Sequence, residues 1–407
     1  MPKLKRLLIP SAALLWGLQF AFLNPALALL LVALFDATAA EVGWVLAVYN
    51  GSGFVASLVL PSYADRKGNY LWPLLACGVL TLALAVLLFV TTSFPIAVIG
   101  LLVLGGPAGV GSSLLFAYLK YSGASPAEVV NTRAIVSVAW VAGPPLATLI
   151  IGIFGNRAVL LAIAAIAVLN IATTAAMLHE RSAGRANSGE PTKPAERTAD
   201  DRPMPRTGIA VIVAAFIALQ AANSAAVSIM SLFVTETLGL DVMWAGVALG
   251  VAAGLEIPAL LLIGRLSYRF SNLRLIASGC VVGIAYYAAM VFVPGPVVLI
   301  GLQVLDAWFF AVVAGVGITL FQQIIPRPGL ASGLFVNTRR LGAIVSGAVI
   351  SFGSLTPLGY GGIFAVCAAL TALALLAIGV AARITKRDAD VSERQRRRGG
   401  LLRNQGA

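Results

Sequence analysis

The chain has 407 residues, of which 59% are apolar and only 11% are charged, with a formal net charge of +12. Soluble globular proteins contain about 45–50% apolar and about 25% charged residues, so this composition excludes that class. The three cysteines, Cys77, Cys280 and Cys367, all lie in apolar runs, which excludes a disulfide-stapled secreted domain. A spanning helix needs about 20 mainly apolar residues, and the apolar content suffices for on the order of twelve.

Apolar stretches of this length lie on both sides of a polar segment, residues 181–207, which we expect to form a flexible loop. The first stretch is too long for a signal peptide and is expected to be retained. A basic tail, 383–407, is expected to be disordered. The predicted fold is therefore an all-α integral membrane protein of twelve transmembrane helices in two six-helix halves, 1–180 and 208–382. The predicted helices cover 8–35, 42–61, 71–92, 95–118, 132–154, 157–178, 208–234, 243–263, 274–294, 296–324, 333–354 and 361–382.

The basic residues predict the orientation in the membrane. With both termini in the cytoplasm, all of the 28 Lys and Arg residues except Arg157 fall on the cytoplasmic side. The opposite loops carry acidic residues instead, such as Asp36 and Asp241. The net positive charge therefore indicates membrane orientation, and no nucleic-acid partner is expected.

The two halves repeat each other in sequence. The sharpest match pairs Val130-Asn131-Thr132-Arg133 with Val336-Asn337-Thr338-Arg339, and weaker matches occur in the same order at a similar offset. Two parallel six-helix halves joined by a long inner loop are the organisation of the major facilitator superfamily. The chain resembles that superfamily in this respect.

A loop motif supports the resemblance. The segment Pro61–Gly68, between the second and third predicted helices, resembles the superfamily's Gly-x-x-x-Asp-Arg-x-Gly signature, and Gly264–Arg269 echoes it in the second half. The sequence departs from the pattern because Pro61 replaces the first glycine and Asn69 replaces a usual basic residue. The resemblance implies an inner gate, in which charged side chains cap helix ends and pair across the halves; an ordinary charged turn is the alternative. The gate residues implied are Asp65, Arg66, Gly68 and Arg269.

Further stretches resemble the bacterial sugar efflux transporters. The most specific is Arg133–Pro145 in the fifth predicted helix, and Gly254–Pro258, Leu302–Asp306 and Leu334–Thr338 are similar to their counterparts in that family. This resemblance covers nearly all of the membrane part. It implies a secondary active transporter of the bacterial inner membrane that exports small sugars or sugar analogues by proton antiport through alternating access.

Two carboxylates, Glu256 and Asp306, lie well inside predicted helices. Asp306 is about ten residues from the outer end of its helix, about 15 Å along the axis and hence near the midplane. Intramembrane carboxylates are costly and indicate function by default. Both are candidate proton carriers, and the alternative is a structural partner for an arginine or a backbone group.

Neutral amides at mid-depth form a second candidate set. They both donate and accept hydrogen bonds, which suits uncharged, hydroxyl-rich ligands. Interhelical hydrogen bonds, worth about 1 kcal/mol each, are an equally good interpretation for any one of them. These candidate substrate-binding residues are Gln19, Asn24, Asn50, Gln220, Asn223 and Gln303.

In the fifth predicted helix, Arg133, Ser137 and Trp140 share one face. Trp140 offers a flat surface to a sugar ring, with packing as the alternative, and Arg133 can pair with an acidic residue; both are predicted to bind substrate. A small-residue and proline run follows, which kinks the helix or permits close packing and is predicted to contribute to gating. That run is Gly143, Pro144 and Pro145.

Several other functions are disfavoured. No Gly-x-x-x-x-Gly-Lys-Ser/Thr motif for ATP occurs, so the energy must come from a gradient. The single histidine, His179, is expected to be solvated, and no metal or cofactor site is expected. A membrane enzyme or a receptor would need clustered catalytic residues or a soluble domain. A drug or other hydrophobic-solute antiporter of the same superfamily is the alternative, although the first half lacks an intramembrane carboxylate to attract cations. A monomer is expected.

Overall fold

The computed structural model describes residues 2–37, 39–188, 204–241 and 243–404, and every regular element in these ranges is a helix. The first half contains α1 (Pro2–Phe35), α2 (Ala39–Lys67), α3 (Leu71–Val90), α4 (Phe94–Gly100), η1 (Leu101–Gly105), α5 (Gly106–Ala108), α6 (Gly111–Tyr121), α7 (Pro126–Phe154) and α8 (Asn156–Ser188). The second half contains α9 (Arg206–Leu232), η2 (Phe233–Thr237), α10 (Met243–Leu266), α11 (Asn272–Met290), α12 (Pro296–Ala311), η3 (Val312–Val316), α13 (Gly317–Ile324), α14 (Pro328–Ser354) and α15 (Tyr360–Asn404).

Each predicted apolar stretch lies largely on these helices. The π-helical turns η1 and η3 interrupt the fourth and tenth stretches, and the seventh ends in η2. In the fourth, Pro107 follows η1 and cannot donate a backbone hydrogen bond, so the regular helix is interrupted there. Within the described residues, nine helices are long and apolar enough to cross a membrane. Helix α14 is not among the nine, and it carries Arg339 and Arg340 near its middle.

The predicted and observed helix boundaries differ by a few residues at most positions, and the two largest differences lie at the ends of α8 and α15. Helix α8 continues to Ser188, into the segment expected to be a loop, and the expected loop itself lies mostly outside the described residues. Helix α15 continues to Asn404, so the prediction of a disordered tail is wrong for that segment. The tail lacks proline and is rich in Arg, which favours helix. The prediction of disorder rested on the charge of the tail and left out this helix propensity.

The helices run up and down the bundle, so its two ends carry different turns. One end, which we call the basic end, holds the turns at 68–70, 122–125, 267–271 and 325–327, beside Arg66, Lys67, Arg269 and Arg327. The other end, here the opposite end, holds the turns at 36–37, 91–93, 155, 238–241, 291–295 and 355–359. Charge therefore gathers at one end, as the sequence predicts.

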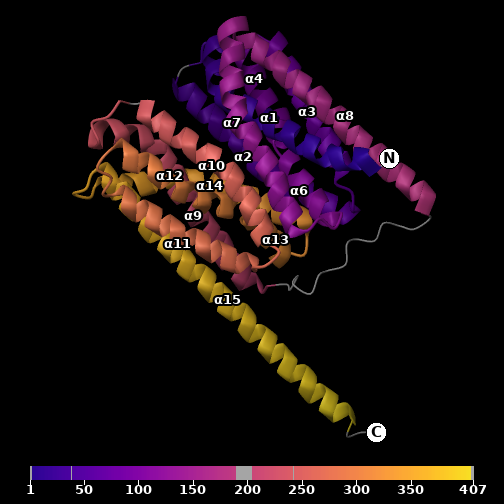
Figure 1. Ribbon diagram of the computed structural model, residues 1–407. Coiled ribbons are helices and arrows are strands. Elements are labelled where there is room, and N and C mark those ends of the chain that lie inside the picture. The colour runs from indigo at the N-terminus through magenta and orange to yellow at the C-terminus, as the bar shows by residue number, and fades with distance from the viewer. Residues whose placement is uncertain (1, 38, 189–203, 242, 405–407) are drawn as a thin grey trace.

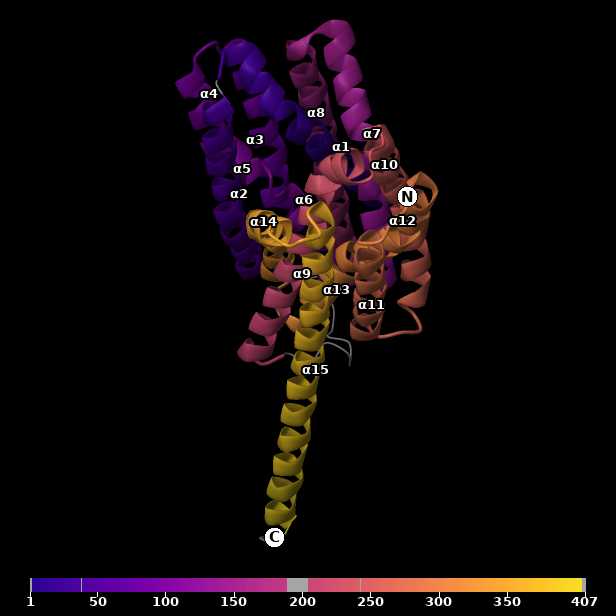
Figure 2. The ribbon, with the colours of Figure 1, turned by 90° about the vertical axis from the view of Figure 1, so that its left-hand side faces the viewer.

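The two halves meet along a few helices. Helix α7 packs against α10, and α14 packs against α2 and α6. Figure 1 shows the halves converging toward the basic end and diverging toward the opposite end. Figure 2 shows α14 of the second half lying against α2 and α6 of the first.

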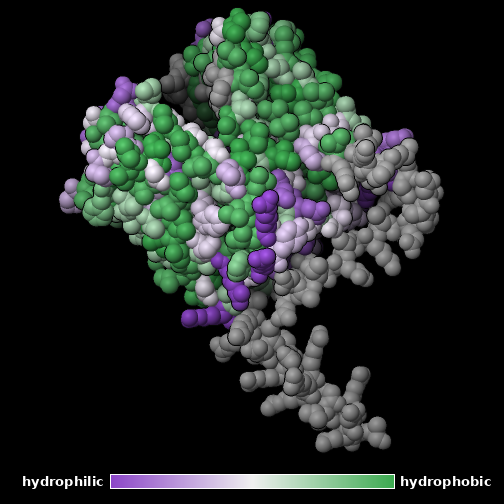
Figure 3. All heavy atoms as spheres, viewed as in Figure 1, coloured by the Kyte–Doolittle hydropathy of each residue, from purple (hydrophilic) through white to green (hydrophobic). Residues whose placement is uncertain are grey.

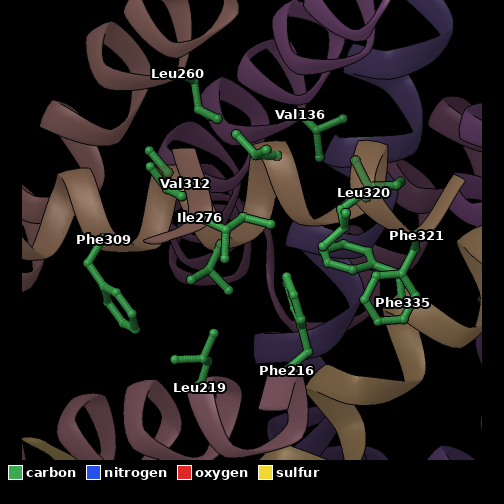
Figure 4. Packing of buried hydrophobic residues seen from close by; sticks show 14 of the residues in the cluster. Val136, Phe216, Leu219, Leu260, Ile276, Phe309, Val312, Leu320, Phe321 and Phe335 are labelled. Carbon is green, nitrogen blue, oxygen red and sulfur yellow. The ribbon is translucent and has the colours of Figure 1, made fainter. Parts of the chain in front are cut away.

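An aromatic cluster holds the second half together near the basic end. Phe216 of α9, Phe321 of α13 and Phe335 of α14 are grouped in Figure 4, with ring centroids 5.1 to 6.1 Å apart and edge-to-face angles. Each such pair contributes about 0.5–1.5 kcal/mol beyond the area it buries. This packing fixes the position of α14, which carries several functional side chains.

The outer surface is apolar. Figure 3 shows apolar side chains covering the sides of the bundle, with charged residues gathered toward the basic end. Large side chains such as Leu149, Val297 and Leu376 are exposed there. A soluble monomer rarely exposes such a surface, so lipid is its natural environment.

Candidate functional site

A charged cluster joins the two halves at mid-depth. The Ser137 hydroxyl of α7 donates a hydrogen bond to Glu256 Oε1 of α10 at 2.7 Å, and Arg133 Nη2 lies 3.8 Å from the same oxygen. Arg133 Nη1 also donates to Ser137 Oγ at 3.2 Å. Ser137 is eleven residues into α7, which places the cluster about 16 Å from the start of that helix. Glu256 is thus bonded to two residues of the other half. One of them is Arg133, which was expected to pair with an acidic residue.

Arg339 of α14 extends the cluster. Its guanidinium lies over the ring of Trp140, 5.3 Å from the centroid, and it interacts electrostatically with Arg133 and Glu256. The side chain is exposed although it is eleven residues into α14, and its contact with Trp140 of α7 places it between the halves. One face of Trp140, predicted to stack on a sugar, is therefore occupied by Arg339.

Asp306 of α12 is 9% exposed and interacts electrostatically with Glu256. Within the described part of the chain, Asp306 has no recorded hydrogen bond or ion pair. One turn earlier, Gln303 donates to the Leu299 carbonyl at 2.9 Å, and its own Oε1 is buried without a recorded partner there. The two candidate carboxylates thus differ: Glu256 is paired and Asp306 is not.

Asp65 closes the basic end. Its Oδ1 accepts hydrogen bonds from the Gly329 amide at 2.8 Å and the Tyr70 hydroxyl at 2.6 Å, and its Oδ2 accepts from the Leu330 amide at 2.9 Å. Burial and the hydrogen bond to Asp65 raise the pKa of Tyr70, so the phenol keeps its proton and remains a donor. Because Arg327, the N-cap of α14, makes no side-chain cap, Asp65 supplies the missing cap from the other half.

The second-half motif behaves differently. Arg269 is exposed in the turn after α10, and Tyr268 stands where the first half has Asp65. Helix α7 caps itself instead, through Ser125 and Glu128, each bonding to the backbone of the other. Only the first-half copy of the motif, through Asp65, therefore caps a helix of the other half in the described part of the chain.

The remaining predicted gate residues lie at the basic end of the first half and in the interior of α7. Gly68 has a φ of +59°, which favours glycine, and its carbonyl accepts from Arg181 Nη2 at 3.3 Å. Arg66 lies in the last turn of α2. A Cβ on Gly143 would lie 2.3 Å from the Cβ of Ala21, so Gly143 permits close packing of α7 on α1 within one half. Pro144 and Pro145 lie within α7, and their side chains lie outside the described residues.

The predicted amides divide into two groups. Gln19 donates to Thr81 at 2.6 Å and accepts from Asn170 at 2.9 Å, which ties α1 to α3 and α8 inside the first half. These contacts favour interhelical bonding over substrate binding for Gln19. Asn50 is exposed and donates to the Leu46 carbonyl. Gln220 is buried, Asn223 is half-buried, and the Asn24 side chain lies outside the described residues.

A second contact between the halves was not predicted. Ser57 of α2 donates to Asn337 Oδ1 of α14 at 2.8 Å, and Arg340 Nη1 lies 3.4 Å from Ser57 Oγ and 3.3 Å from Asn337 Oδ1. A Cβ on Gly333 would lie 1.9 Å from the Ser57 carbonyl oxygen. Near the basic end, Gln322 donates to the Phe116 carbonyl across the same interface at 2.9 Å.

The repeat could have led to some of these residues. Asn337 and Arg339 match Asn131 and Arg133 in the repeated segment. Because Arg133 is a predicted site residue, the repeat indicates Arg339 as a second candidate. Arg340 has no basic counterpart in the first half, where Ala134 stands, and the repeat gives no signal for it.

Comparisons with known proteins agree with this architecture. The model of the Major Facilitator Superfamily matches residues 11–347. Sugar efflux transporter A of Dickeya chrysanthemi is 32% identical over 312 residues, covering 74% of this chain and 77% of the relative. A putative sugar efflux transporter of Deinococcus radiodurans is 31% identical over 372 residues, covering 88% and 93%. Sugar efflux transporter A of Escherichia coli is 28% identical over 343 residues, covering 83% and 86%.

Solved structures share the fold. The E. coli fucose:proton symporter FucP has a TM-score of 0.72 at 13% identity, covering 92% of this chain and 97% of that one. A bacterial homologue of the iron transporter ferroportin, in an outward-facing state, has a TM-score of 0.73 at 13% identity, covering 92% and 98%. The all-helical architecture and the family match lead to one assignment. The chain belongs to the Major Facilitator Superfamily of transporters.

Proposed function

We propose that this protein exports small sugars or sugar analogues from a bacterial cell by proton antiport through alternating access. The observation that carries the proposal is the polar cluster of Arg133, Ser137, Glu256 and Arg339, which joins the halves at mid-depth in an otherwise apolar bundle. Support for the substrate class comes from the relatives, which are named sugar efflux transporters.

The cluster suits a polyhydroxylated ligand. Guanidinium groups donate, carboxylates accept and a hydroxyl does both, so a sugar replaces water at each of them without loss of hydrogen bonds. Exposed Arg339 and unpaired Asp306 are the proposed first contacts for the sugar. Gln220, Asn223 and Asn50 remain candidate contacts on the neighbouring helices.

Asp306 is the proposed proton carrier. Glu256 is engaged by Ser137 and Arg133, whereas Asp306 has neither a hydrogen bond nor an ion pair recorded among the described residues. Protonation removes the negative charge that strengthens hydrogen bonds from sugar hydroxyls to the carboxylate, so protonation and sugar binding compete. One proton moved through 100 mV supplies about 2.3 kcal/mol, enough to sustain a sugar gradient of roughly 50-fold.

The gate follows from the contacts at the basic end. We place that end in the cytoplasm, as the basic residues predict, so the closed arrangement faces outward. To open inward, α14 must leave α2, which breaks the Asp65 cap and the Ser57–Asn337 hydrogen bond. Ligand binding has to offset that loss.

Counterflow into proteoliposomes tests the proposal. The purified protein is expected to exchange labelled mono- and disaccharides, and an inward proton gradient is expected to drive sugar efflux from the side that carries the basic end. Asp306→Asn is expected to keep counterflow and lose proton-driven accumulation, because exchange needs no net proton movement.

Two outcomes would refute parts of the proposal. Absence of exchange with every sugar of the panel, alongside exchange of an apolar drug, would favour the hydrophobic-solute antiporter. Undiminished proton-driven transport by Asp306→Asn would remove Asp306 from coupling. Ser122→Ala, an exposed hydroxyl at the basic end, is the matched control and is expected to transport normally.

A further inference from the structure

Arg339 is a cation at an unusual depth. It lies eleven residues into α14, about 16 Å from the start of the helix, yet its side chain is exposed. A charge at this depth is costly unless it faces a paired group or a water-filled space. The exposed side chain contacts Trp140 of the other half, so Arg339 lies between the halves, where a substrate must pass.

The charges around Arg339 do not balance. The charged groups within its electrostatic reach are Arg133 and Glu256. Glu256 is bonded to Ser137 and paired with Arg133 on the other half, so two guanidiniums share one carboxylate. Among the described residues, Arg339 has no recorded hydrogen bond or salt bridge of its own. The guanidinium of Arg339 therefore keeps donors that no described side chain uses.

Trp140 holds this guanidinium in place. The guanidinium carbon of Arg339 lies over the Trp140 ring, 5.3 Å from its centroid, and this cation–π contact favours the observed position of the side chain without using its N–H donors. The next residue, Arg340, donates hydrogen bonds to Ser57 and Asn337 in the interface between the halves. Of these two neighbouring arginines, Arg339 alone is oriented and available.

We propose that Arg339, stacked on Trp140, binds a carboxylate group of the transported sugar, so that the substrate class extends to sugar acids such as uronates. A planar guanidinium matches a carboxylate with two parallel hydrogen bonds, a geometry that a hydroxyl cannot reproduce. The inference rests on the proposed sugar transport. It is distinct from the coupling step, because Asp306 is not among the charges acting on Arg339.

A ligand series on the purified full chain tests this inference. Isothermal titration compares D-glucuronate, its neutral methyl ester and D-glucose. The wild-type protein is expected to bind glucuronate at least tenfold more tightly than the methyl ester, which differs only in the charged group. This arm needs no variant, so a folding defect cannot obscure it.

A variant series locates the contact. Arg339→Gln is expected to lower glucuronate affinity at least tenfold more than glucose affinity, because glutamine still donates hydrogen bonds to hydroxyls but carries no charge. Arg339→Lys is expected to retain part of the preference for glucuronate. Arg274→Gln removes an exposed positive charge at the start of α11 and is expected to change neither affinity. Circular dichroism and the melting temperature confirm that each variant is folded.

The outcomes separate the two proposals. Binding of glucose with equal or weaker binding of glucuronate than of its ester would overturn the carboxylate subsite and leave sugar transport standing. An equal loss of both ligands in Arg339→Gln would likewise overturn it, because the arginine would then serve the general fold of the site. Failure of these three ligands to bind, together with absence of exchange for the whole mono- and disaccharide panel, would refute the proposed function itself.

Discussion

Replacing Asp65 by Asn is expected to open the basic end of the protein. The carboxylate accepts two backbone amides at the start of α14 and the Tyr70 hydroxyl, at 2.6 to 2.9 Å. Asparagine keeps one acceptor oxygen and loses the charge that favours a helix N-terminus. Loss of a charged hydrogen-bond partner costs about 1.5–3 kcal/mol. The equilibrium between closed and open basic ends should therefore shift roughly 10- to 150-fold toward the open form.

Double electron–electron resonance measures this shift. Ser122→Cys and Ser271→Cys place spin labels on exposed turns at the basic end of opposite halves. The native cysteines are buried and should not label. Asp65→Asn is expected to move population to longer distances, and Asp36→Asn, an exposed carboxylate at the opposite end, should not. An unchanged distance distribution in Asp65→Asn would refute the assigned role of the cap.

Three further changes test other contacts. Gly333→Ala places a Cβ 1.9 Å from the Ser57 carbonyl oxygen and should weaken closure in the same distance measurement, whereas Gly347→Ala on the same helix meets nothing within 4 Å and should be silent. Because the pKa of Tyr70 is raised in the folded protein, the stability it contributes should be complete below about pH 10 and fall as the pH rises further. Chemical denaturation across this range should show the decline, and Tyr70→Phe should lack it. Gln19→Leu leaves buried partners unpaired and should lower the unfolding free energy by about 1–3 kcal/mol; a large rise in sugar KM without such a loss would instead make Gln19 a substrate ligand.

Much of the fold follows from composition and repetition alone. Long apolar runs predict helices because every backbone polar group in lipid must bond within its own segment. The repeat then predicts two similar halves. The ends of helices were less well predicted, as α8 and α15 show, because a polar helix outside the apolar core has no hydropathy signal.

The site residues that the sequence predicts well are isolated polar residues in otherwise apolar runs. Glu256 and Asp306 stand out as carboxylates in apolar runs, and Arg133 was expected to pair with an acidic residue, as the ion pair with Glu256 shows. Which face a side chain takes could not be predicted. Gln19 and Gln220 match in the repeat, yet Gln19 bonds to its own half. Arg339 and Arg340 are adjacent, yet one contacts Trp140 and the other Ser57. This difference depends on the rotation of α14 about its axis.

The difference between the two caps has a consequence for assembly. Helix α7 closes its own N-terminus through Ser125 and Glu128, whereas α14 depends on Asp65, which precedes it by more than half the chain. During synthesis the first half emerges first and can complete itself. The second half then finds its missing cap already in place. Expressed as separate fragments, the first half should insert and resist protease alone, and the second should do so only when the first is present.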